Sequence, residues 1–177
     1  MKISKVTPIV HHYNIKLEPS DTDYTSCMWA KFSFDCDSGI LSITSDAGDF
    51  SYRWGYNENE DFMHLMCRIN ADYLLNKISD RTVFKYKESV DELVKDIELN
   101  GYDTYGIESE EQWLGIKEEL LESTFSSEES YLLNADTLIP DIELESIPVE
   151  KDYPYGAQII VKIFEKYLQP EIRKEFL

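Results

Sequence analysis

Hydrophobic and polar positions tend to alternate in the first third of the chain. The alternation runs through four short segments, residues 9–17, 27–36, 41–44 and 50–54. Turn-forming residues separate them, as in Asp37-Ser38-Gly39 between the second and third segments. A period of two interrupted by Gly and Asp turns is typical of antiparallel strands. The sequence therefore predicts an N-terminal antiparallel β-meander of about four strands.

Helical spacing replaces this alternation after Gly55. Apolar side chains recur every three or four positions in four segments, near residues 62–74, 87–99, 109–121 and 155–167, with a shorter candidate at 127–133. This spacing places the apolar residues on one face of a helix. The remainder of residues 126–154 has no regular pattern. We therefore expect about four C-terminal helices.

Local signals support the ends of these helices. The acidic residues Glu58, Glu60 and Asp61 precede the first helix, where the helix dipole favours negative charge. Ser109 with Gln112 three positions later predicts a capping box at the start of the third. Asn100-Gly101 predicts the end of the second, and Pro170 predicts a break in the last.

Strands followed by helices indicate an α+β fold, in which helices cover one face of the meander. A chain of 177 residues is long enough for one sizeable core and short for two. We therefore expect a single domain over residues 1–177, mainly β in 1–56 and mainly α in 57–177.

The charge of the chain is strongly negative and unevenly placed. The sequence has 17 basic and 35 acidic residues, a formal charge of -18. Residues 96–150, called here the acidic block, hold sixteen of the carboxylates and a single basic residue, Lys117. Because nucleic acids and anionic membranes are polyanions, we do not expect the chain to bind either directly.

The acidic block also carries the apolar residues that a folded structure needs, so its carboxylates are expected on a solvent-facing surface. Such a surface can serve solubility, or it can bind a basic surface of another protein. The aromatic residues of the block supply either anchors for a partner or core side chains, and the sequence leaves both open for Tyr102, Tyr105, Trp113 and Tyr131. The predicted partner-binding residues are Glu108, Glu110, Glu111, Glu118, Glu119, Glu122, Glu128, Glu129, Tyr102 and Tyr105.

Residues suited to catalysis or metal binding are few. His11 and His12 are adjacent on a predicted strand and point to opposite faces. The three cysteines, Cys27, Cys36 and Cys67, form no CxxC pair, which favours free buried thiols. Phosphate-binding glycine motifs and common hydrolase and kinase signatures are absent. We therefore predict no enzyme activity, cofactor or specific metal site, although a divalent cation on the acidic block stays open.

Targeting signals are missing from the sequence as given. The first residues, Met1 to Lys5, lead into Pro8 without an apolar signal-peptide region, and no apolar run is long enough to span a membrane. Together with the unpaired cysteines, this favours a reducing, cytoplasmic compartment.

Residues 41–78 resemble a segment of uncharacterised small proteins encoded by phages and prophages. The resemblance lies in the strand–turn–strand Leu41–Gly55, then Phe62, then the run Asp72-Tyr73-Leu74-Leu75-Asn76-Lys77. It implies a phage-type origin and transfers no site residues. In charge, the chain is also similar to acidic DNA-mimic inhibitors of bacterial defence systems.

These observations favour a phage-encoded inhibitor of a defence system that acts on nucleic acids, such as an anti-CRISPR or anti-restriction protein. Its acidic face would occupy the nucleic-acid groove of a basic host protein in the bacterial cytoplasm. The alternative is a phage accessory factor or small-substrate enzyme whose acidity serves only solubility. A homodimeric structural module is a third hypothesis.

Overall fold

A computed structural model describes residues 7–55 and 61–177. The predicted α+β class is confirmed. The contacts of the chain form two compact units. One, called here the sheet unit, comprises residues 1–81 and 153–177, and the other, called the acidic unit, comprises residues 82–152. The sequence analysis expects one domain, whereas the apolar residues fall into two separate buried clusters, one in each unit.

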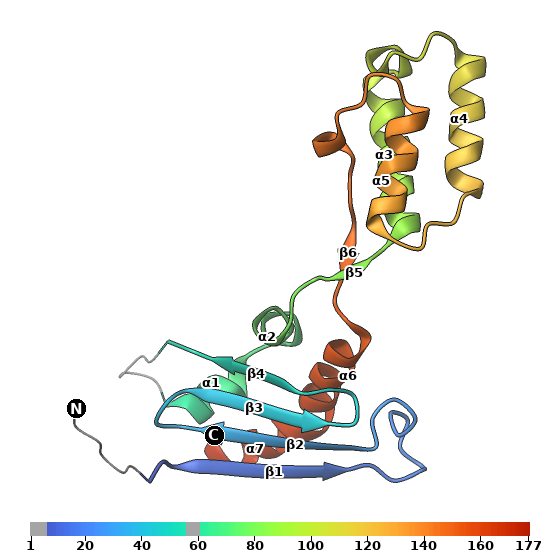
Figure 1. The fold of residues 1–177 in the computed structure, drawn as a ribbon. Helices are drawn as coiled ribbons and strands as arrows, with labels where there is room; N and C mark the ends of the chain where they lie inside the picture. Colours follow the sequence, from blue (N-terminus) through green and yellow to red (C-terminus); the bar gives the residue numbers. More distant parts are fainter. Residues whose placement is uncertain (1–6, 56–60) are drawn as a thin grey trace, which may run out of the picture. The chain divides into compact units, whose positions relative to one another are not determined.

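The predicted meander forms the sheet of the first unit. The strands are β1 (Val10–Lys16), β2 (Trp29–Asp35), β3 (Ile40–Ser45) and β4 (Phe50–Arg53), in the order β1-β2-β3-β4 and all antiparallel (Figure 1). Gly39 in the turn before β3 has a φ of 64°, a left-handed conformation that favours glycine.

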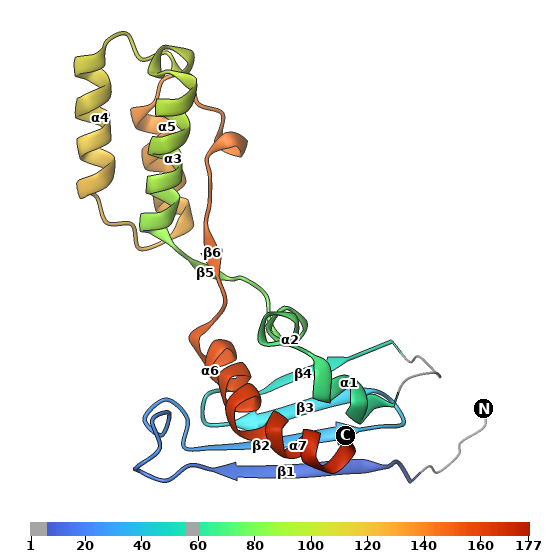
Figure 2. The same cartoon turned by 180° about the vertical axis from the view of Figure 1, so that it is seen from behind.

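Helices cover one face of this sheet and leave the other open. The covering elements are α1 (Phe62–Arg68), α2 (Ala71–Ile78), α6 (Tyr155–Ile163), the π-helical turn η3 (Phe164–Leu168) and α7 (Gln169–Phe176). Figure 2, seen from behind, shows the C-terminal segment from α6 to α7 running in front of the strands. Phe32, Phe34 and Ile43 point from the sheet into this layer and are at most 2% exposed.

The acidic unit is helical, with its own core. Its elements are β5 (Val83–Phe84), α3 (Tyr86–Asn100), the 3-10 turn η1 (Tyr102–Tyr105), α4 (Glu110–Glu122), α5 (Glu128–Leu138), the 3-10 turn η2 (Leu144–Ser146) and β6 (Lys151–Asp152). The antiparallel pair β5–β6 joins the two ends of the unit. Leu93, Ile97 and Leu120 are fully buried in its core. The helices α3 to α5 thus bury their apolar faces against one another.

Two predicted helix boundaries are wrong. The first predicted helix is interrupted after Arg68, because Ile69 adopts an extended conformation and the Asn70 side chain accepts a hydrogen bond from Tyr73 N as the cap of α2. Pro170 does not break the last helix, because it occupies the first turn of α7, where its missing N–H costs nothing. The expected acidic residues Glu58 and Glu60 lie outside the described residues, whereas Asp61 caps α1.

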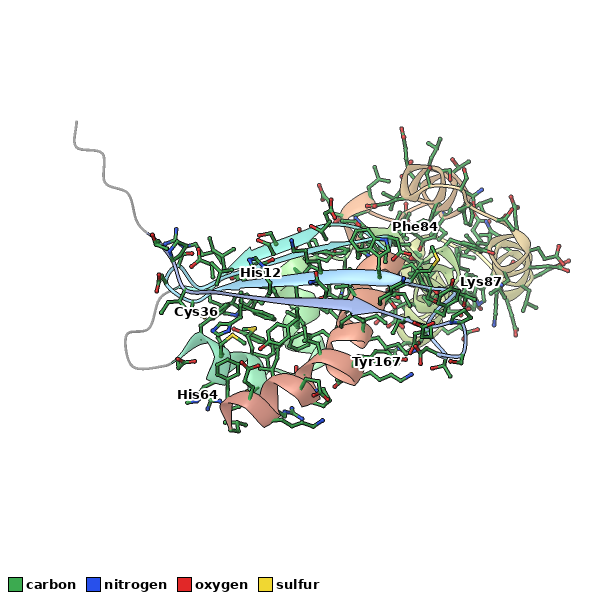
Figure 3. The ribbon with its side chains drawn as sticks, turned by 90° about the horizontal axis from the view of Figure 1, so that it is seen from below. His12, Cys36, His64, Phe84, Lys87 and Tyr167 are labelled. Carbon is green, nitrogen blue, oxygen red and sulfur yellow. The ribbon has the colours of Figure 1, made fainter. Side chains whose placement is uncertain are left out.

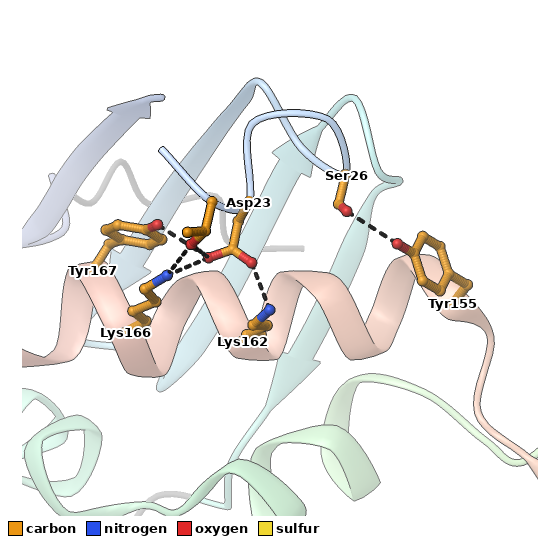
Figure 4. A network of polar contacts seen from close by, with 7 residues as sticks. Asp23, Ser26, Tyr155, Lys162, Lys166 and Tyr167 are labelled. Atoms are coloured by element: carbon orange, nitrogen blue, oxygen red, sulfur yellow. Dashed lines mark hydrogen bonds and ion pairs between the residues drawn. The ribbon is translucent and has the colours of Figure 1, made fainter. Parts of the chain in front are cut away.

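A buried carboxylate fixes the loop between β1 and β2 to the long C-terminal helix (Figure 4). Asp23 is 3% exposed. Its carboxylate forms ion pairs with Lys162 Nζ at 2.5 Å and Lys166 Nζ at 2.6 Å, and accepts a hydrogen bond from the Tyr167 hydroxyl at 3.0 Å. The hydrogen bond from Lys162, followed by that from Lys166, holds the pKa of Asp23 well below its usual range.

Asp23→Asn is expected to lower the free energy of unfolding by about 2 kcal/mol at neutral pH, because the charged hydrogen bonds are lost. Since the folded pKa is lowered, the wild-type advantage should be constant above about pH 4 and should shrink as the pH falls further. Urea unfolding of both proteins between about pH 7 and pH 3 measures this difference. Asp49→Asn, at an exposed carboxylate, is the control and should show no such difference. A difference for Asp23→Asn that did not change with pH would contradict the assignment.

Candidate functional site

The excess negative charge lies almost entirely in the acidic unit. Residues 82–152 contain twenty acidic and five basic side chains, a formal charge of -15, whereas the sheet unit carries -3. Of the sixteen carboxylates of the acidic block, all but Asp96 and Glu128 are exposed. The unit is therefore a folded body whose surface, rather than a flexible tail, displays the charge.

The helix α4 displays a row of carboxylates opposite its buried side. Ser109 Oγ accepts a hydrogen bond from Gln112 N at 3.2 Å and starts the helix, as predicted. The other half of the expected capping box differs, because Gln112 Oε1 accepts from Glu108 N. The buried side consists of Trp113, Ile116 and Leu120.

Glu111, Glu118 and Glu122 are separated by seven and four residues, so they share the exposed side of α4. With a rise of about 1.5 Å per residue, they are roughly 10 Å and 6 Å apart along the axis. Phosphates of one DNA strand recur about every 3.4 Å, so this row alone is sparser than a strand. A match to a nucleic-acid groove therefore requires carboxylates from neighbouring elements as well.

The helix α5 adds a groove that combines apolar and acidic side chains. Ser127 caps this helix, with Ser130 completing a capping box. Leu133 is 66% exposed and Leu144, from η2, is 53% exposed. They line an open groove of about 500 Å³, and the remaining lining residues are Glu128, Glu129, Leu132 and Asp136. The groove therefore offers apolar contact area bordered by three carboxylates.

Few of the carboxylates are neutralised. Within the described part of the chain, the ion pairs of the acidic unit include Lys85–Glu88, Lys95–Glu92, Lys117–Glu98 and Lys151–Glu128. Among the ten predicted partner-binding residues, only Glu128 takes part in one of these pairs, at 2.7 Å from Lys151 Nζ. The negative charge of the other predicted carboxylates is thus available to interact with solvent ions or with a basic partner.

The predicted aromatic residues contribute mostly to the core. Trp113 is 5% exposed and Tyr131 is fully buried, so both belong to the interior of the unit. Tyr102 and Tyr105 are half-buried and pack against the same cluster. The Tyr105 hydroxyl donates to Asp96 Oδ2 at 2.6 Å, and this hydrogen bond raises its pKa. Each tyrosine therefore keeps part of its ring exposed, and a role of either one in partner binding stays a prediction.

Three surface residues that the sequence interpretation missed lie in the groove: Leu133, Asp136 and Leu144. Glu129, Leu133 and Asp136 follow helical spacing, but the predicted helix ended at residue 133 and hid this pattern. Leu144 has no local signal, because only the fold brings η2 next to α5. The structure brings Glu128 and Glu129 together with these residues, and places the glutamates of α4 on a separate helix.

The histidines and cysteines have structural surroundings. His11 packs edge-on against Phe176, and His12 Nδ1 lies 2.8 Å from Ser33 Oγ on the opposite face of the sheet, as predicted. Figure 3 shows His12 away from the helices and Cys36 and His64 on the helical side. All three cysteines are free thiols, and burial raises the pKa of Cys27 to about 12. In residues 7–55 and 61–177, no group of three or more His, Cys, Asp or Glu side chains is placed to hold a metal ion.

Comparison with known families decides the origin of the chain. The model of Phage_phiTE_072, a phage family, matches residues 1–174. The chain belongs to this family. Membership confirms the phage origin implied by the segment 41–78, and extends it over nearly the whole chain. Neither the curated proteins nor the solved structures contain a match.

None of the helices formed by the described residues is both long and apolar enough to cross a bilayer.

Proposed function

We propose that this phage protein inhibits a bacterial defence system that acts on nucleic acids. The acidic unit binds the basic nucleic-acid groove of a host protein, such as a CRISPR effector or a restriction enzyme. The observation that carries the proposal is a formal charge of -15 on one compact unit, together with fourteen exposed carboxylates in residues 96–150. A groove whose Lys and Arg side chains bind nucleic-acid phosphates also attracts a surface of carboxylates, because both carry negative charge.

Long-range attraction accelerates association, whereas lasting affinity requires desolvated contacts at the centre of an interface. The groove on α5 supplies these contacts, because Leu133 and Leu144 offer apolar area inside the acidic field. A matching partner surface has an apolar side chain flanked by lysines or arginines. In this proposal the protein acts in the host cytoplasm by protein–protein binding, without its own catalysis, cofactor or direct contact with nucleic acid.

The experiment compares neutralised variants in a displacement assay. Host proteins captured by the wild-type chain at low salt are purified, and each is loaded with a labelled nucleic acid that it binds. The wild-type chain should displace this nucleic acid, with an affinity that falls as salt rises. The triple change Glu111→Gln, Glu118→Gln and Glu122→Gln should weaken displacement by at least about tenfold, equivalent to about 1.4 kcal/mol.

A matched control changes three exposed carboxylates of the sheet unit, with Asp49→Asn, Asp80→Asn and Glu165→Gln. It alters the net charge equally and should displace nucleic acid as the wild type does. An equal loss in both triple variants, or no loss in the first, would refute recognition by the acidic unit. Reduced solubility of both triple variants with no captured nucleic-acid-binding protein would support the solubility alternative instead.

A further inference from the structure

The uncovered face of the sheet has the opposite charge character to the acidic unit. The exposed side chains of its four strands are His12, Asn14, Lys16, Trp29, Lys31, Ser42, Thr44, Ser51 and Arg53. None of these side chains is acidic. Among the residues of the four strands, Asp35 is the one carboxylate on this face; it is half-buried and accepts hydrogen bonds from the backbone N–H groups of Asp37 and Ser38. Directly after β3, Asp46 adds an exposed carboxylate that accepts hydrogen bonds from the backbone of Met28 and Trp29. In a chain of formal charge -18, the strands thus present three basic side chains, Lys16, Lys31 and Arg53, against one carboxylate on this face.

A cavity of about 660 Å³ opens on this face at the end of the β1–β2 pair. Lys16, Tyr24, Met28, Trp29 and Lys31 are among its lining residues, and Glu18 is the one carboxylate among them. The strand register places Lys16 directly opposite Trp29, and Asn14 opposite Lys31. Opposed side chains of paired strands lie about 5 Å apart at Cβ. The register thus places two lysines and an asparagine at positions neighbouring one tryptophan.

The indole is presented to solvent from a fixed backbone. Trp29 is 42% exposed, although Ala30, Phe32 and Phe34 on the other face of β2 are at most 1% exposed. The Asp46 carboxylate accepts hydrogen bonds from Met28 N at 2.9 Å and from Trp29 N at 3.4 Å. This bridge from the β3–β4 turn holds the first residue of β2 in place. An exposed ring on a rigid base loses little entropy when a planar ligand stacks on it.

Lys16 and Lys31 are free to pair with a ligand. Within residues 7–55 and 61–177, neither ammonium group forms an ion pair or a side-chain hydrogen bond. A ligand complementary to the cavity has a flat aromatic part that stacks on Trp29 and an anionic part that pairs with the two lysines. Nucleotides have both, since bases stack on aromatic side chains and phosphates pair with lysines.

We propose that this cavity binds a mononucleotide, with its base stacked on Trp29 and its phosphate between Lys16 and Lys31. Asn14 supplies a hydrogen-bonding amide beside the phosphate. A single nucleotide fits better than a long strand, because the repulsion from a chain of charge -18 grows with each added phosphate. The proposal is independent of the function assigned to the acidic unit, because all of these residues belong to the sheet unit.

Intrinsic fluorescence gives a direct test on the full chain. Trp54 and Trp113 are 7% and 5% exposed, so Trp29 is the accessible indole of the three. Titration with AMP, GMP, CMP and UMP should quench its emission saturably for at least one nucleotide. Inorganic phosphate should not quench, because it lacks a ring. Phosphate binding as tightly as every nucleotide, or no saturable signal with any of them, would overturn the proposal.

Calorimetry on variants then locates the site. Trp29→Ala, Lys16→Gln and Lys31→Gln should each weaken nucleotide binding by about tenfold or more. Lys174→Gln, at an exposed lysine of α7, is the matched control and should bind as the wild type does. Circular dichroism of each variant should match the wild type, since all of these side chains are exposed. Unchanged affinity in the two cavity lysine variants would refute the assignment even if Trp29→Ala failed to fold.

Binding of an oligonucleotide and of the α4 triple variant completes the test. An oligonucleotide that binds while all four mononucleotides fail would overturn the commitment to a mononucleotide. The triple glutamine variant of α4 should bind the nucleotide with wild-type affinity. If it does so while failing to displace nucleic acid from a host protein, both proposals are supported separately.

Discussion

Tyr131→Ala is expected to destabilise the acidic unit strongly while the sheet unit keeps its stability. The ring is fully buried and contacts Phe84 and Phe125, and its hydroxyl donates to the carbonyl oxygens of Ser89 and Pro148, each at 3.1 Å. Truncation of a buried aromatic side chain costs about 3–5 kcal/mol. A unit of about 70 residues has a total stability of only about 4–10 kcal/mol. The loss therefore removes about half of the stability of the unit or more.

Hydrogen exchange read residue by residue measures this effect. Amides of α3, α4 and α5 should lose protection, whereas amides of β2 and β3 should keep it, because the two cores share no buried residue. Tyr131→Phe keeps the ring and loses the two hydrogen bonds, so it should cost only about 1–3 kcal/mol. Equal loss of protection in both units would show that they unfold as one cooperative body. The nucleotide cavity should survive in Tyr131→Ala, and partner binding should not.

Gln169→Leu is expected to destabilise the sheet unit by about 2–4 kcal/mol, because it leaves buried carbonyl groups without partners. Gln169 is 3% exposed, and its Nε2 donates to the carbonyl oxygens of Met66 at 3.0 Å and Ile69 at 2.7 Å. Its Oε1 accepts from Arg173, which also donates to the carbonyl of Cys67 at 2.7 Å. These bonds satisfy the last carbonyls of α1, which have no partner within the helix.

Urea unfolding followed through the sheet unit gives the size of this effect. Leu has a similar volume to Gln, so the loss reports hydrogen bonding rather than a cavity. Gln158→Leu is the matched control: its Nε2 makes a single bond, to the Tyr153 carbonyl at 2.8 Å, and a smaller loss of about 1 kcal/mol is expected. Comparable losses for Gln158→Leu and Gln169→Leu would contradict the role given to the two buried carbonyls.

The meander could be predicted from sequence because its signal is local. Alternation in β1 to β4 depends on which side chains face one core, and Asp37-Ser38-Gly39 defines the turn between β2 and β3. The interruption of the helix at Ile69 could not be predicted from sequence. Ile69 keeps the helical spacing, and its extended backbone still buries the side chain in the same core. Pro170 was misread because the π-helical turn η3 shifts the phase of the helix before it.

The concentration of charge follows from sequence alone, because residues 96–150 are contiguous and contain one basic residue, Lys117, whatever the fold. Tertiary structure decided how the apolar residues were shared between two cores, since burial depends on which faces meet. It also formed both proposed binding surfaces, the cavity at Trp29 and the groove on α5. Strand register sets Lys16 opposite Trp29, and folding brings Leu144 beside Leu133. Both pairs join residues that are distant along the chain, so no local pattern records them.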